Sequence, residues 1–149
     1  MERAEVMAWR KAERARLIAA RLATPADDRA AWSARIAEEL DQAIGAVEGL
    51  VISVYWPFRG EPDLRPWMNA VALRGGRCAL PVVVEKGAPL AFRIWREGEA
   101  LERGVWNIPI PAGGDAVEPD VAITPVVGFD RAGYRLGYGG GFFDRTLAA

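Results

Sequence analysis

The chain has 149 residues, which is the length of one domain able to bury roughly two thirds of its unfolded surface. Hydrophobic residues make up 51% of it, charged residues 26%, and the net charge is −1, so nothing favours nucleic acid or a membrane surface as a partner. No apolar run approaches the length of a membrane span and the N-terminus lacks the order of a signal peptide, so we expect a single cytoplasmic domain over residues 1–149.

The chain contains no histidine and one cysteine, Cys78, and these two counts exclude several chemistries. Serine–histidine and cysteine–histidine relays, histidine-bearing zinc sites and thiolate metal sites are all ruled out. Any metal must be held by oxygen atoms, and catalysis must rest on arginines, carboxylates, backbone N–H groups and a hard cation, the set used in phosphoryl transfer. Cys78 itself lies in an apolar run, so we expect a buried structural thiol.

The first part of the chain predicts two helices. Residues 3–22 are rich in Ala, Leu, Arg and Glu, which are good helix formers, and one side of this helix is basic. A second helix is expected over 25–45, with Thr24 as its N-cap, Pro25 at its first position and Gly45 near its end. A stripe expected to face the core is formed by Trp32, Ile36, Leu40 and Ile44.

The middle of the chain alternates between strand-like and helix-like segments. A helix is expected over 63–74, and strands are expected over 50–56, 78–84, 90–95 and 121–127. This order indicates a three-layer α/β/α fold, Rossmann-like, with a mainly parallel sheet. Ligands bind at the carboxyl ends of the strands in such sheets, so we expect residues 56–61 and the segment after 121–127 to face each other across one site.

That later segment is glycine-rich, with five glycines in the nine residues from Gly133 to Gly141. Glycine permits positive φ and lets successive N–H groups approach an anion, which makes this a candidate phosphate-binding loop. It does not match the Walker A motif, because neither lysine, Lys11 or Lys86, is followed by Ser or Thr, and it does not match a dinucleotide fingerprint, because Phe142 stands where glycine is needed.

A glycine-rich hairpin without a ligand is the alternative interpretation of this segment. Arg135 and Asp144 favour binding, because a guanidinium can fork onto phosphate oxygens and a carboxylate beside phosphates can hold Mg²⁺.

The run from Gly128-Phe129-Asp130 through Gly133-Tyr134-Arg135-Leu136-Gly137-Tyr138-Gly139-Gly140-Gly141 to Asp144-Arg145 resembles the signature of the 5-formyltetrahydrofolate cyclo-ligase family, also called methenyltetrahydrofolate synthetases. Segments upstream of this run resemble segments of the same family and follow the same order along the chain. Trp106-Asn107-Ile108-Pro109 with Pro111 resembles the family's W-N-I-P-x-P segment, and Ser53 to Glu61 resembles its strand that ends in a substrate-contacting glutamate. Arg10 and Arg14 fall where the family has a Lys-x-x-x-Arg pair, so the similarity spans nearly the whole chain.

The resemblance implies an ATP- and Mg²⁺-dependent enzyme that converts 5-formyltetrahydrofolate into 5,10-methenyltetrahydrofolate, with these small molecules as partners. It implies that Arg135 and Asp144 are catalytic, with Asp144 holding the metal. The residues implied to bind ATP are Arg10, Lys11, Arg14, Arg135, Leu136, Gly137, Tyr138, Gly139, Gly140, Gly141, Phe142 and Phe143. Those implied to bind the folate are Trp56, Glu61, Trp106, Tyr138 and Phe142, with Glu61 pairing with pterin N–H donors.

Simpler interpretations of the same residues are a solvated basic helix for Arg10 and Arg14, core packing for Trp56 and Trp106, and a plain surface acid for Glu61. Arg135 could likewise be an exposed turn arginine, and Asp144 an acid in the first turn of a helix.

The chain also departs from the family pattern. It has Arg10 where lysine is usual, with Lys11 beside it, and Phe142-Phe143 lacks the tyrosine hydroxyls common there. It stops at Ala149, five residues after Asp144, where family chains usually continue, so we expect a missing C-terminal part and an open sheet edge, with a monomer or weak self-association. The alternative functions are a nucleotide- or folate-binding paralogue without catalysis, and a sugar-phosphate or acyl-transfer enzyme on a similar scaffold.

Overall fold

Two helices form where the sequence is richest in helix-forming residues. In the computed structural model, which describes residues 2–149, α1 spans Arg3–Ala23 and α2 spans Ala26–Ile44, close to the predicted bounds. Gly45 ends α2 with a φ of 76°, as expected. The predicted N-cap is wrong: the Thr24 hydroxyl donates back to the Ala20 carbonyl at 3.0 Å, and Pro25 occupies the cap position without a side-chain bond.

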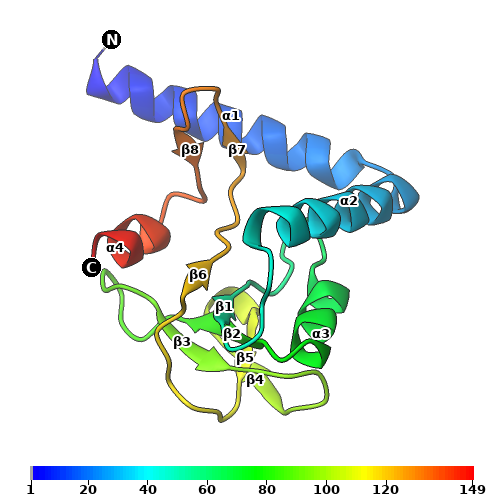
Figure 1. The fold of residues 1–149 in the computed structure, drawn as a ribbon. Helices are drawn as coiled ribbons and strands as arrows, with labels where there is room; N and C mark the ends of the chain where they lie inside the picture. The colour runs from blue at the N-terminus through cyan, green and yellow to red at the C-terminus, as the bar shows by residue number, and fades with distance from the viewer. Residues whose placement is uncertain (1) are drawn as a thin grey trace.

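A four-stranded sheet lies at the centre of the chain, in the order β3-β2-β1-β6 (Figure 1). Its strands are β1 (Val51–Ser53), β2 (Arg77–Val82), β3 (Ala91–Ile94) and β6 (Val121–Ala122). β1 runs parallel to both β2 and β6, and β3 pairs antiparallel with β2. Helix α3 (Arg65–Leu73) connects β1 to β2 and packs against β2. A mixed α/β fold with a mainly parallel sheet is therefore confirmed.

All four strands of the sheet are shorter than predicted, and prolines account for the early ends of β1 and β6. After Ser53 the chain makes one more bond to β2, from the Val54 N–H to the Ala79 carbonyl, and then leaves the sheet before Pro57, which has no N–H to donate. The expected strand over 121–127 ends at Ala122, since Pro125 also interrupts pairing. Both segments thus turn away from the sheet at its carboxyl edge.

The last predicted strand does not run directly into the glycine loop. A hairpin of β7 (Gly128–Phe129) and β8 (Arg135–Leu136) comes between them, and α4 (Phe142–Ala148) follows the loop. A second hairpin was not predicted: β4 (Leu101–Arg103) pairs with β5 (Pro109–Pro111) around a 3-10 turn over Val105–Asn107. Its strands are short and partly charged, so they carry no clear alternation of apolar and polar residues.

The main core lies between the sheet and helices α2 and α3. Ile36, Leu40 and Ile44 pack against it as predicted. Trp32 does not, because it is 59% exposed. The inward face of α2 begins at Ser33, which contacts the segment after β1, and this rotation turns Trp32 outward.

Cys78 is buried in the same core, and burial raises the pKa of its thiol to about 12. The prediction of a structural thiol is confirmed.

Candidate functional site

A cavity of about 800 Å³ lies beside the carboxyl ends of β1 and β2. Helix α1 and the β7–β8 hairpin, which lie side by side in Figure 1, form part of its wall. The contact is close, since a Cβ at Gly128 in β7 would meet Leu17 of α1 at 2.8 Å. The cavity is thus enclosed by segments from both ends of the chain.

Almost every residue assigned to ATP or folate from the sequence lines this cavity. They are Arg10, Arg14, Trp56, Glu61, Trp106, Arg135, Leu136, Gly137, Tyr138, Gly139, Gly140, Gly141, Phe142, Phe143 and Asp144. Lys11 is the exception among residues 2–149, because it lies on an exposed side of α1 whereas Arg10 and Arg14, four apart, share the face that meets the cavity. The glycine loop and the strand-end segment therefore face each other as predicted.

The backbone of the glycine loop is held against α1 by a hydrogen bond from Arg14. Nε of Arg14 donates to the carbonyl of Gly137 at 2.8 Å. Two loop residues, Gly139 and Gly141, have φ values of 98° and 68°, which disfavour any side chain with a Cβ. The interpretation of α1 as a merely solvated basic helix is therefore wrong for Arg14, and the glycines are required by the loop's conformation.

Glu61 ends a tight turn that begins at Phe58. The turn is closed by the Glu61 N–H donating to the Phe58 carbonyl at 3.1 Å, and both central residues, Arg59 and Gly60, have positive φ. The Glu61 carboxylate accepts from the Phe58 N–H at 2.8 Å through Oε1 and from the Tyr138 hydroxyl at 3.0 Å through Oε2. A strand-end turn and the glycine loop, 77 residues apart, thus meet at one carboxylate.

Burial controls the ionisation of this pair. Glu61 is 8% exposed, so it is not a plain surface acid, and burial raises its pKa while the Tyr138 hydroxyl, the Phe58 N–H and the nearby Arg21 charge oppose that rise. Burial also raises the pKa of Tyr138 to about 12, so its hydroxyl keeps its proton at neutral pH.

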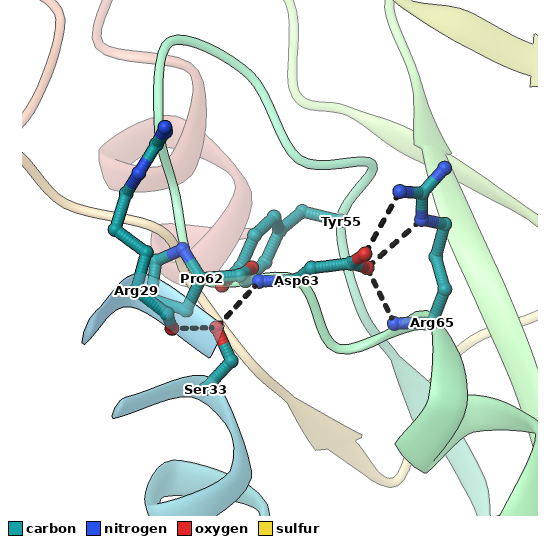
Figure 2. Close-up of polar contacts among 6 residues, drawn as sticks. All are labelled: Arg29, Ser33, Tyr55, Pro62, Asp63 and Arg65. Atoms are coloured by element: carbon teal, nitrogen blue, oxygen red, sulfur yellow. Dashed lines mark hydrogen bonds and ion pairs between the residues drawn. The ribbon is translucent and has the colours of Figure 1, made fainter. Parts of the chain in front are cut away.

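The backbone just after Glu61 is held by polar contacts from α2, from α3 and from the segment that follows β1 (Figure 2). The Tyr55 hydroxyl donates to the Pro62 carbonyl at 2.9 Å, and the Asp63 N–H donates to Oγ of Ser33 in α2 at 3.1 Å. Arg65 donates from its guanidinium to both Asp63 oxygens at 2.8 Å, and this contact is the main cause of the lowered pKa of Asp63. These bonds fix the position from which Glu61 reaches the cavity.

Three aromatic rings gather at the cavity next to Glu61. Phe58 stacks on Trp106 with ring centroids 6.0 Å apart, and Tyr138 lies 5.9 Å from the first and 6.4 Å from the second. Trp106 is 52% exposed with a φ of 57°, so core packing does not explain it. Trp56 serves both purposes, since it lines the cavity and packs edge-on against the buried Trp95 at 5.5 Å.

Sequence reasoning missed Phe58 as a cavity residue and Arg21 as a partner of Tyr138. Phe58 could have been found, because it follows the first predicted strand at the edge where ligands bind. Arg21 gave no such signal, since its bond to Tyr138 joins residues 117 positions apart.

Arg135 and Asp144 lie together at another part of the wall. Nη2 of Arg135 is 3.5 Å from Oδ1 of Asp144, whose side chain is 81% exposed. Across residues 2–149 no group of three or more acidic, histidine or cysteine side chains could hold a metal. One open carboxylate fits Mg²⁺ that arrives on phosphate oxygens with its waters, since this ion is commonly held by one or two carboxylates and its substrate.

The chain resembles known proteins over most of its length. The model of the 5-formyltetrahydrofolate cyclo-ligase family matches residues 6–149. The 5-formyltetrahydrofolate cyclo-ligase of Mycolicibacterium smegmatis is 34% identical over 109 residues, covering 68% of this chain and 56% of that protein. The enzyme of the same name from Escherichia coli is 38% identical over 102 residues, covering 64% of this chain and 56% of that protein. The chain therefore spans about half the length of the curated relatives it matches.

Two solved structures have a similar fold. The 5,10-methenyltetrahydrofolate synthetase of Aquifex aeolicus superposes with a TM-score of 0.78 at 27% identity, over 93% of this chain and 72% of that one. The 5,10-methenyltetrahydrofolate synthetase of Mycoplasma pneumoniae superposes with a TM-score of 0.71 at 19% identity, over 93% of this chain and 77% of that one, which supports the fold. None of the helices in residues 2–149 has the length and apolar character needed to cross a membrane. The chain belongs to the 5-formyltetrahydrofolate cyclo-ligase family.

Proposed function

We propose that the protein uses ATP and Mg²⁺ to cyclise 5-formyltetrahydrofolate to 5,10-methenyltetrahydrofolate, with release of ADP and phosphate. One observation carries the proposal: the glycine loop and the Glu61 turn meet in one cavity, joined by the 3.0 Å bond from Tyr138 to Glu61. This arrangement offers a phosphate-binding backbone and a pterin-binding carboxylate on neighbouring walls.

The reaction needs no nucleophile from the protein, which suits a chain without histidine and with its one cysteine buried. The formyl oxygen attacks the γ-phosphorus and ADP leaves; N10 then attacks the formyl carbon, loses its proton, and phosphate departs with the former formyl oxygen. Bound Mg²⁺ would supply neutralisation of charge on the phosphates. The protein's tasks are to align the two substrates and to exclude water that would hydrolyse the activated intermediate.

On the nucleotide side, we assign Arg135 and the loop amides from Gly137 to Gly141 to the phosphates, and Asp144 to the metal. Arg10 and Arg14 line the cavity from α1, where Arg14 also contacts the glycine loop, and both can add positive charge. Lys11 is left out of this assignment because it does not line the cavity described for residues 2–149.

On the folate side, the three rings of Phe58, Trp106 and Tyr138 offer stacking surface to a flat pterin. Each oxygen of Glu61 uses one lone pair on a protein donor, so each keeps one for an N–H of the substrate. Glu61 can therefore orient the pterin without breaking its own contacts.

The direct test follows the absorbance of methenyltetrahydrofolate on mixing the protein with 5-formyltetrahydrofolate. Product is expected with ATP and Mg²⁺ together and not with either omitted. Arg135→Ala should weaken ATP binding by about 1.5–3 kcal/mol, because it removes a charged forked donor from phosphate. Binding of both substrates by calorimetry without product would instead indicate a paralogue that has lost catalysis.

A further inference from the structure

Arg21, near the end of α1, joins the two segments that meet at Glu61. Its Nε donates to the carbonyl of Arg59 at 2.9 Å, and its Nη2 donates to the hydroxyl of Tyr138 at 2.5 Å. Arg21 is not among the residues of the described chain that line the cavity. Arg21 therefore acts on a molecule bound there without touching it, through Tyr138, through the turn or through its charge near Glu61.

The donors and acceptors in this contact fix the direction of one proton. A guanidinium has donors only, so the Tyr138 oxygen must accept from Arg21. The single hydroxyl proton of Tyr138 is then directed to Oε2 of Glu61, 3.0 Å away. Tyr138 cannot reverse this bond while Arg21 is in place, so Glu61 is held in the role of acceptor.

We propose that Arg21 is a positioning residue, which orients the Tyr138 hydroxyl toward Glu61 and thereby holds the Glu61 carboxylate ready to accept N–H groups of the substrate. The proposal rests on the proposed function, in which Glu61 pairs with the pterin. Oε1 is fixed by the Phe58 N–H at 2.8 Å, so the two bonds together set the plane of the carboxylate. Without Arg21 the hydroxyl is free to rotate, and one of those two bonds is no longer directed.

The effect of Arg21 on the pKa of Glu61 can be separated from the effects of the other ionisable groups around Glu61. The other ionisable residues nearby are Tyr55, Arg59, Asp63 and Arg29. The Arg59 guanidinium lies 5.9 Å from the Tyr138 ring centroid, and Nη1 of Arg29 lies 3.3 Å from where a Gly60 Cβ would be. They come from the segment around Glu61 and from α2, so all four groups remain in a variant of Arg21, although the bond from Arg21 to the Arg59 carbonyl is lost. The Arg21 charge and the Tyr138 bond both lower the pKa of Glu61 against the effect of burial, so losing Arg21 raises that pKa.

The test is a double-mutant cycle on the full chain with Arg21→Gln, Tyr138→Phe and both together. The Glu61 carboxyl is titrated by ¹³C NMR without ligand, its signal assigned by its loss in Glu61→Gln. Each single variant should raise the Glu61 pKa. The Glu61 pKa of the double variant should be no higher than that of Arg21→Gln. The KM for 5-formyltetrahydrofolate should rise about tenfold in each single variant and no further in the double, while the KM for ATP stays unchanged.

The matched control is Arg35→Gln, which removes an exposed arginine of α2 paired with Glu39 at 3.2 Å and should alter neither readout. The proposal would be overturned if the two substitutions had additive effects on the Glu61 pKa or on the KM for 5-formyltetrahydrofolate. It would also be overturned if Tyr138→Phe left the Glu61 pKa unchanged. If Arg21→Gln does not fold, Arg21→Met takes its place in the cycle, since it keeps an unbranched side chain and removes every donor. If the wild-type protein forms no methenyl product, the proposed function fails, and the ligand-free titration still decides the role of Arg21.

Discussion

Arg14 Nε and the Gly137 carbonyl, 123 residues apart in the chain, form a 2.8 Å hydrogen bond that holds the glycine loop against α1. The rest of the Arg14 guanidinium lies beside Gly139, within 3.5–3.7 Å of the point where a Cβ would be placed. The loop's shape therefore depends on two things, the glycines that permit its backbone and the arginine that packs against it.

Gly139→Ala should damage the loop, whereas Gly137→Ala should not. Gly139 has a φ of 98°, where an alanine costs about 1–3 kcal/mol in backbone strain, while its methyl would make only ordinary contact with Arg14. Gly137 lies outside the left-handed region and a Cβ there meets nothing within 4 Å. Calorimetric titration with ATP and Mg²⁺ should show weaker binding for Gly139→Ala only, and equal affinities for the two variants would contradict this account of the loop.

Asp144→Asn should raise the Mg²⁺ concentration needed for nucleotide binding without unfolding the protein. The side chain is exposed and its only described partner is Arg135 at 3.5 Å, so removing its charge disturbs little else in residues 2–149. A suitable control is Asp28→Asn, an acid in the first turn of α2 that does not line the cavity. Mg²⁺ titrations at fixed ATP that coincide for wild type and Asp144→Asn would remove Asp144 from the metal site.

Asp41→Ala tests the packing of α2 on α3. Oδ1 of Asp41 accepts from Nε1 of Trp67 at 2.8 Å and from Arg74 at 2.9 Å, and Trp67 is only 4% exposed. Removing the carboxylate leaves a buried indole N–H without its partner, which should lower the free energy of unfolding by about 1–3 kcal/mol. Urea denaturation measures this change. The control is Glu39→Ala, which breaks only an exposed pair with Arg35 and should change the free energy of unfolding by less than about 1 kcal/mol.

The sequence predicted the elements whose signal is local. Composition was enough for α1 and α2, and the apolar run around Cys78 correctly indicated a buried strand. The prediction was less accurate near Pro125, since the expected strand over 121–127 makes its last bond to β1 from the Ile123 N–H and the chain then forms the β7–β8 hairpin. Apolar character alone could not reveal that a run lacks the N–H groups needed for pairing.

The candidate site followed from motif resemblance more than from periodicity. The resemblance brought Glu61 and the glycine loop to one site, and the cavity contains both. It could not show that Glu61 is buried, or that its carboxylate accepts from Tyr138, 77 residues away. The direction of the Tyr138 hydroxyl depends on Arg21, another long-range contact, and no local pattern in the chain encodes it.

The buried Glu61 carboxylate should leave a signature in the pH dependence of stability. Burial raises its pKa above the ordinary value of 4.5, so between these two values the folded chain holds more protons than the unfolded chain. The contribution of Glu61 to the free energy of unfolding therefore falls as pH rises through this interval, and stays low above it. Asp41 and Asp63, whose pKa values are lowered, act in the opposite sense, since their contribution is lost as pH falls.

Comparison of wild type with Glu61→Gln isolates the first effect, because the two aspartates titrate in both proteins. The amide introduced by this substitution cannot ionise, so the stability of the variant relative to wild type should increase as pH rises from about 4 to about 8. Urea denaturation at steps of pH measures this difference. A difference that is constant with pH would mean that Glu61 titrates as it does in the unfolded chain, and that its burial beneath Tyr138 carries no electrostatic cost.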